Sequence, residues 1–176
     1  MRYAAFLRAV NVAGNQLSMQ ALKLMVESLG LEDPKSLLQS GNIIFEARNR
    51  KAADLEELLR RETEKRLKVL TEYFIRDAKA LTKIIEVNPF AREAKADPGH
   101  LVVFFLKRKP SGESMSKLQA QIKGPEIVKP GECHLYITYP AGQGRSKLTN
   151  AAIEKAIESR GTARNWNTVL KMHAAM

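Results

Sequence analysis

The segment Leu101-Val102-Val103-Phe104-Phe105-Leu106 is apolar at six successive positions. A fully apolar run of this length is typical of a strand that is buried on both faces of a sheet. We therefore predict a central strand here, and the elements on either side of it are assigned from their own patterns.

The second half of the chain continues from this strand as helix, two strands, helix, strand and helix. Pro130-Gly131 separates the two middle strands, and Gly161 ends the long helix that precedes the last strand. The predicted ranges are a helix at 114–122, strands at 126–128 and 132–139, a helix at 148–158, a brief strand at 162–164 and a final helix at 166–172.

The first half shows the same order of elements. Ser18 is a suitable N-cap for a helix that Gly30 closes, and Ser40-Gly41 separates two short strands, which favours a hairpin over a single bulged strand. In the charged helix, i,i+4 ion pairs are expected for Glu56/Arg60, Glu57/Arg61 and Glu62/Arg66. The predicted ranges are strands at 3–8, 37–39, 42–45 and 69–76, and helices from Ser18 to Gly30, at 52–67 and at 80–87.

The order β-α-β-β-α-β, found twice, is that of the ferredoxin-like fold. We predict an α+β protein with two ferredoxin-like subdomains side by side: residues 1–87, a connection at 88–99, and residues 100–176 with a C-terminal helix. A duplication is inferred from the order of elements alone, because no repeat is visible at the level of residues.

Composition limits the class of protein. The chain has 176 residues, 44% of them hydrophobic, and no apolar run approaches the roughly 18 residues that span a bilayer. Its first residues read as a strand rather than a signal peptide, and its single cysteine, Cys133, fits a reducing compartment. A cytoplasmic protein without a membrane partner is expected.

The net charge of +10 is unevenly distributed. Residues 1–88 carry 15 Lys and Arg against 12 Asp and Glu, whereas residues 89–176 carry 14 against 7. A basic surface attracts polyanions whatever their sequence, although the same charge can serve solubility alone. The aromatic signature with which RNA-recognition modules stack bases is missing from the predicted central strands, so nucleic-acid binding is expected on charge alone.

Four polar blocks, spread over the chain, carry a resemblance to a known family. They are Leu7–Val12, Gln39–Phe45, Ser146–Leu148 and Thr162–Thr168. In this order they resemble the bacterial domain-of-unknown-function family 1697, which implies a pair of ferredoxin-like subdomains and supplies no activity. Ala9 and Ala13 stand where that family usually has glycine; if those glycines have positive φ, alanine costs energy there.

The polar residues of these blocks lie near predicted strand ends. Such ends can converge into one cleft, and arginine with amides suits a phosphate or carboxylate. The alternative is that the amides satisfy buried backbone groups and lock the subdomains together, as Trp166 is expected to do as a core anchor. The candidate ligand-binding residues in a cleft between the two subdomains are Arg8, Asn11, Gln39, Ser40, Asn42, Arg164 and Asn165.

A second candidate is the loop Ala141–Lys147, which leads into a helix. Its glycines, backbone N–H groups and cations could hold an anion through Arg145, Ser146 and Lys147, whereas capping of the helix by Ser146 is the commoner explanation. The glycine spacing is not that of a Walker A loop. No Cys/His/Asp cluster suggests a metal, no cofactor is expected, and no paired carboxylates point to acid–base catalysis.

Three functional hypotheses are compatible with these sequence features. The first is a protein that binds a small phosphorylated or carboxylated metabolite. The second is binding of RNA or DNA through the basic second half. The third is an enzyme that acts on a nucleotide-like substrate and uses Arg8 and Arg164 electrostatically.

Overall fold

The computed structural model describes residues 1–10, 16–37, 41–48 and 50–176. The chain forms two compact units, of which the first comprises residues 1–83 and 171–176 and the second residues 84–170. The first unit is therefore discontinuous, because helix α7 (Trp166–Ala174) begins in the second unit and ends in the first. Helix α3 (Ala78–Glu86) likewise begins in the first unit and ends in the second.

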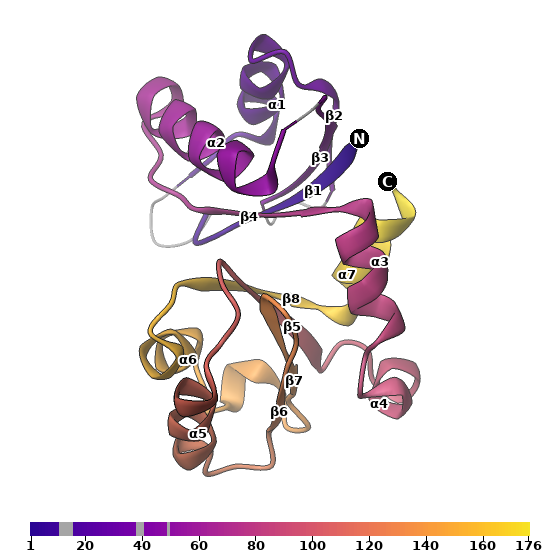
Figure 1. Ribbon diagram of the computed structural model, residues 1–176, viewed down its shortest axis with the longest axis vertical. Helices are drawn as coiled ribbons and strands as arrows, with labels where there is room; N and C mark the ends of the chain where they lie inside the picture. Colours follow the sequence, from indigo (N-terminus) through magenta and orange to yellow (C-terminus); the bar gives the residue numbers. More distant parts are fainter. Residues whose placement is uncertain (11–15, 38–40, 49) are drawn as a thin grey trace. The chain divides into compact units, whose positions relative to one another are not determined.

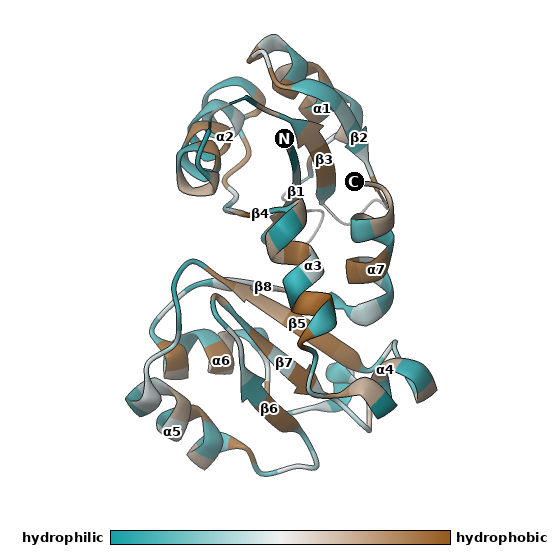
Figure 2. Cartoon of the chain, turned by 45° about the vertical axis from the view of Figure 1, so that its right-hand side comes forward, coloured by the Kyte–Doolittle hydropathy of each residue, from teal (hydrophilic) through white to brown (hydrophobic). Residues whose placement is uncertain are grey.

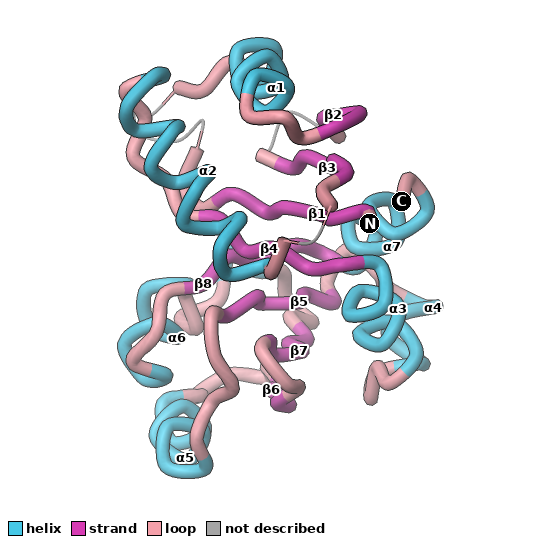
Figure 3. The backbone as a smooth tube through the Cα atoms, turned by 45° about the horizontal axis from the view of Figure 1, so that its top comes forward, coloured by secondary structure: helices cyan, strands magenta, loops and turns pink. Residues whose placement is uncertain are grey.

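The first unit is a four-stranded antiparallel sheet with two helices against one face (Figures 1 and 3). Its strand order, β2-β3-β1-β4, is that of a ferredoxin-like unit. The elements are β1 (Arg2–Leu7), α1 (Met19–Ser28), β2 (Glu32–Ser36), β3 (Asn42–Glu46), α2 (Ala52–Leu67) and β4 (Tyr73–Asp77).

The second unit repeats this architecture with the order β6-β7-β5-β8. Its helices are α5 and α6, which lie next to each other in Figure 1, and the short helix α4 precedes its first strand. The elements are α4 (Ala91–Ala96), β5 (Leu101–Leu106), α5 (Gly112–Gln121), β6 (Ile127–Pro130), β7 (His134–Thr138), the 3₁₀ turn η1 (Gln143–Arg145), α6 (Asn150–Ile157) and β8 (Gly161–Asn165). The two ferredoxin-like subdomains are thus confirmed.

The predicted central strand is correct in range and position. β5 covers residues 101–106, pairs with β7 on one side and β8 on the other, and buries all six side chains. It is coloured as hydrophobic along its length in Figure 2. Val102, Phe104 and Leu106 face the helices, in the same core as Leu118 of α5 and Ile153 of α6.

The strand before Gly41 lies earlier than predicted. β2 covers residues 32–36 instead of 37–39, and its antiparallel pairing with β3 confirms the hairpin. Glu-Asp-Pro-Lys-Ser has no alternating apolar pattern because β2 is an edge strand, with one buried residue, Pro34. Charge and proline on an edge strand discourage pairing with other molecules. Leu38 and Gln39 lie outside the described residues.

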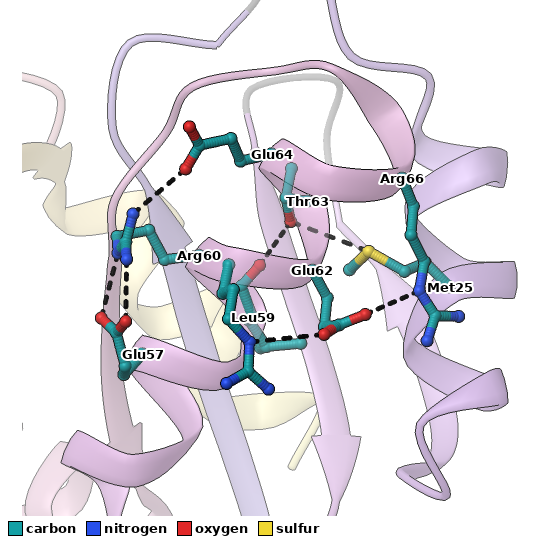
Figure 4. A network of polar contacts seen from close by, with 9 residues as sticks. Met25, Glu57, Leu59, Arg60, Glu62, Thr63, Glu64 and Arg66 are labelled. Atoms are coloured by element: carbon teal, nitrogen blue, oxygen red, sulfur yellow. Dashed lines mark hydrogen bonds and ion pairs between the residues drawn. The ribbon is translucent and has the colours of Figure 1, made fainter.

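Helix α2 has the predicted bounds, but its ion pairs differ (Figure 4). Glu62 pairs with Arg66 as expected, at 2.7 Å. Arg60 instead pairs with Glu57 at 2.7 Å and with Glu64 at 3.3 Å. Glu56 accepts a hydrogen bond from the N–H of Ile75, so it connects α2 to β4. The i,i+4 rule therefore predicted one of the three pairs.

Candidate functional site

The described residues of the blocks at 7–12 and 39–45 meet at one end of the first sheet. Because β1 and β3 are antiparallel, the end of β1 lies beside the start of β3, with Phe6 opposite Asn42. The N–H of Leu7 donates to the carbonyl of Gly41 at 2.8 Å. Arg8 and Asn42 therefore lie at the same sheet end, as predicted for two strand-end residues.

The backbone of Arg8 is held by the two residues that precede β4. Its N–H donates to the carbonyl of Glu72 at 2.9 Å, and its carbonyl accepts from the hydroxyl of Thr71 at 2.8 Å. The side chain of Arg8 is half-buried. Sequence reasoning missed Thr71, and no local pattern could have found it, since its partner is 63 residues away.

Asn42 has a structural role at this end. It is fully buried, its Nδ2 donates to the carbonyl of Leu37 at 3.2 Å, and its carbonyl accepts from the N–H of Leu37 at 3.0 Å. These bonds close the β2–β3 connection. The other predicted residues of these blocks, Asn11, Gln39 and Ser40, lie outside the described residues, so their part in a site stays a prediction.

Ala9 has the left-handed backbone conformation expected of a glycine, with φ +54°. For an alanine this conformation costs roughly 1–2 kcal/mol. Ala13 lies outside the described residues. Ala9 therefore carries backbone strain immediately after Arg8.

Replacing Ala9 with glycine is expected to raise the free energy of unfolding by about 1 kcal/mol, because glycine adopts positive φ without a steric penalty. Chemical denaturation of the two proteins measures this difference. As a control, Ala120→Gly, at an exposed position of α5, should lower it by up to about 1 kcal/mol. An A9G variant less stable than the starting protein would show that Ala9 carries no strain.

In the second unit, Arg164 lies on β8 opposite Val103 of β5. Val103 alternates with Val102 and Phe104, which face the helices, so Arg164 is on the face of the sheet away from α5 and α6. Its Nη1 donates to Thr162 Oγ1 and to the carbonyl of Ala163, both at 2.8 Å.

The environment of Arg164 is unusual for a guanidinium. Although the residue as a whole is only half-buried, loss of water around its charged group lowers the pKa of Arg164 to about 10. Desolvation is the physical cause, since burial disfavours the charged form of a base. The group is still a cation at neutral pH, held in a place where a charge is costly.

Asn165 caps a helix. Its Oδ1 accepts hydrogen bonds from the N–H and from the hydroxyl of Thr168, both at 2.9 Å, at the start of α7. Trp166 is buried, as expected of a core anchor. In these two residues the polar block therefore serves the fold, whereas Arg164 of the same block carries a desolvated charge.

The loop before α6 is built differently from the prediction. The cap of α6 is Thr149, whose Oγ1 accepts from the N–H of Ala152 at 3.2 Å, and not Ser146. The hydroxyl of Ser146 accepts from the N–H of Leu148 at 2.9 Å and donates to the carboxylate of Glu126. A carboxylate at this hydroxyl disfavours an anion there.

Arg145 and Lys147 on either side of Ser146 are exposed. Their cationic groups are therefore solvated, unlike that of Arg164. Arg8, Arg145 and Arg164 are the arginines among the predicted site residues. Arg8 and Arg164 are half-buried, whereas Arg145 is exposed.

The arrangement defines a two-unit ferredoxin-like protein with arginines at a strand end and on a sheet face. The chain belongs to the family of proteins of unknown function DUF1697, whose model matches residues 1–136. No curated protein matches it. The conserved bacterial protein SP0830 from Streptococcus pneumoniae has a similar structure, with a TM-score of 0.76 and 19% identity over 99% of this chain and 97% of that one. At this identity the likeness shows the fold alone.

Along the described part of the chain, no helix is both long enough and apolar enough to cross a membrane.

Proposed function

We propose that the protein binds a small phosphorylated or carboxylated ligand through the guanidinium of Arg164. The observation that carries this proposal is a guanidinium that two hydrogen bonds hold on the face of the sheet away from α5 and α6. Desolvation of the same group, which is still charged at neutral pH, supports it. An adjacent anion offsets the cost of a desolvated cation, and the attraction between the two is stronger where water is excluded. Binding would also raise the pKa of Arg164 toward its ordinary value.

The geometry of Arg164 suits recognition of an anion. Nη1 is fixed by two hydrogen bonds, so the plane of the guanidinium is set before a ligand arrives. A preorganised planar fork loses little conformational entropy on binding phosphate or carboxylate oxygens. Lysine could not replace it, because an ammonium lacks the planar fork.

Thermal shift with inorganic phosphate, nucleotides, sugar phosphates and dicarboxylates tests the proposal. A ligand at 100 times its dissociation constant stabilises the folded state by about 2.7 kcal/mol. For a protein of this size that raises the melting temperature by roughly 5–10 °C. We expect Arg164→Met to abolish the shift and Lys155→Gln, which removes an exposed charge from the same unit, to retain it.

The same variants separate binding from a structural role. Relief of desolvation in R164M should offset the lost hydrogen bonds, so the free energy of unfolding should stay within about 1 kcal/mol of the original. A variant that unfolds, or one that keeps the ligand shift, would refute the proposal.

The same experiment also tests two other predictions made from the sequence, a role of Arg8 in ligand binding and an enzymatic activity. Arg8→Gln tests whether Arg8 contributes to the same ligand, since the shift should then fall in this variant too. The enzyme hypothesis requires turnover of a ligand that causes a shift, with loss of turnover in R164M. Product analysis after incubation with each positive ligand distinguishes an enzyme from a binding protein.

A further inference from the structure

Four cations gather at one end of the second sheet. Lys107, Arg108 and Lys109 follow the end of β5, and Arg160 precedes the start of β8. The last residue of β5, Leu106, is paired with the first of β8, Gly161, so Lys107 and Arg160 leave neighbouring strand ends. All four side chains are exposed. We call these four residues the basic end.

The basic end is tied to the rest of the unit. Nη2 of Arg108 donates to the carbonyl of Glu158, the residue that caps α6, at 2.9 Å. This bond uses one N–H of Arg108. Because the carbonyl is neutral, the bond does not neutralise the charge of the guanidinium. It fixes the loop after β5 against the end of α6.

Carboxylates near the basic end take part in exposed ion pairs. Lys117 pairs with Glu113 at 2.9 Å and with Glu158 at 3.2 Å. Lys109 approaches Glu132 at 3.8 Å, with more than two thirds of each side chain exposed. A pair of that kind contributes about 0–1 kcal/mol and yields readily to a stronger anion.

The whole second unit adds to the attraction. Residues 84–170 carry 13 Lys and Arg against 8 Asp and Glu, and every one of these cations except Arg164 is exposed. Such an excess steers polyanions toward the unit over several ångströms, depending on salt.

The chemistry of the surface selects the kind of polyanion. All six Phe, four Tyr and the single Trp are buried, so none of these rings is available for stacking on unpaired bases. None of the exposed large apolar residues belongs to the basic end, so an apolar anchor for a bilayer is missing there. What remains is contact with regularly spaced phosphates.

We propose that the basic end binds the phosphate backbone of double-stranded nucleic acid without reading its sequence. Lysine and arginine contacts to phosphates position a protein on a duplex and carry no base specificity. This activity is separate from the ligand site at Arg164 and does not depend on it.

Fluorescence anisotropy with a 30-base-pair DNA duplex of arbitrary sequence tests the proposal on the full chain. Four phosphate contacts give a slope of about −3.6 in log affinity against log salt, so binding should be about 100-fold weaker at 200 mM than at 50 mM salt. The triple variant K107Q/R108Q/K109Q should lower this slope by about 3. Should that variant fail to fold, K107Q/R160Q keeps Arg108 and should lower it by about 2.

The matched control is K123Q/K129Q/K155Q, which removes three exposed cations of the same unit outside the basic end. It should keep a salt slope near that of the original protein. Equal losses in both triple variants would overturn the assignment to the basic end. No binding to the duplex at 50 mM salt, tighter binding to the single strand, or tighter binding to phosphatidylserine vesicles would overturn the proposal itself.

Discussion

Replacing Gly41 with alanine is expected to lower the free energy of unfolding by about 3 kcal/mol, measured by chemical denaturation. Gly41 has φ +72°, where alanine costs roughly 1–2 kcal/mol. An added Cβ would also lie 2.5 Å from Cγ2 of Val10 and 3.1 Å from Cβ of Leu7. Overpacking of this kind typically lowers the free energy of unfolding by a further ~1–3 kcal/mol.

A second glycine separates these two costs. Gly30 has φ +73°, and no atom lies within 4 Å of a Cβ built there, so G30A measures the backbone penalty alone. In the G41A background, Val10→Ala removes the closest atom and should recover part of the loss. If G41A costs no more than G30A, the close approach of Gly41 to β1 has no energetic weight.

Above pH 10 the protein is expected to lose stability steeply because of its buried tyrosines. Burial raises the pKa of Tyr136 to about 12 and that of Tyr73 and Tyr139 further still, and also raises the pKa of Tyr3. In the unfolded chain tyrosine ionises near 10, so its proton is retained only in the folded state as pH rises. At pH 11 the free energy of unfolding is therefore lower by about 4 kcal/mol because of Tyr73, Tyr136 and Tyr139 together.

Arg164 acts in the opposite direction. The pKa of Arg164 is lower in the folded protein than in the unfolded chain, so its buried charge destabilises the fold at neutral pH. As pH rises through about 10 the group loses its proton, and the free energy of unfolding rises by about 1 kcal/mol at pH 11. The net fall should be about 3 kcal/mol. Denaturant melts at pH 9, 10 and 11, together with tyrosinate absorbance, measure it.

Tyr136→Phe is the control for the alkaline effect. Its hydroxyl donates to the carbonyl of Ile84 at 2.7 Å, so the variant loses about 1 kcal/mol at neutral pH. Between pH 10 and 11 it should fall less steeply than the original protein, since one titrating group is absent. Tyrosinate absorbance that appears before unfolding would contradict the assignment to buried tyrosines.

Elements that face the core were predictable from sequence, because burial imposes a pattern on them. The apolar run of β5 and the charged but periodic α2 were placed correctly to the residue. β2 and α4 were missed or misplaced because neither depends on an apolar face: β2 buries only Pro34, and α4 buries no residue.

The candidate site was harder to predict because its chemistry depends on partners distant in sequence. Residue type suggested that Ser146 caps a helix, yet its carboxylate partner, Glu126, is 20 residues away. Asn165 and Arg164 are neighbours in one polar block, but one caps α7 and the other is desolvated on a sheet face. Position along the chain does not reveal this difference in hydration.

Because residues 171–176 belong to the first unit, a ribosome must translate the whole second unit before the first can be completed. Until then Arg2 lacks the Met176 carbonyl to which it donates at 2.6 Å, and Thr82 lacks His173 at 2.8 Å. The first unit, although synthesised first, can therefore form its last contacts only after the second unit has been synthesised.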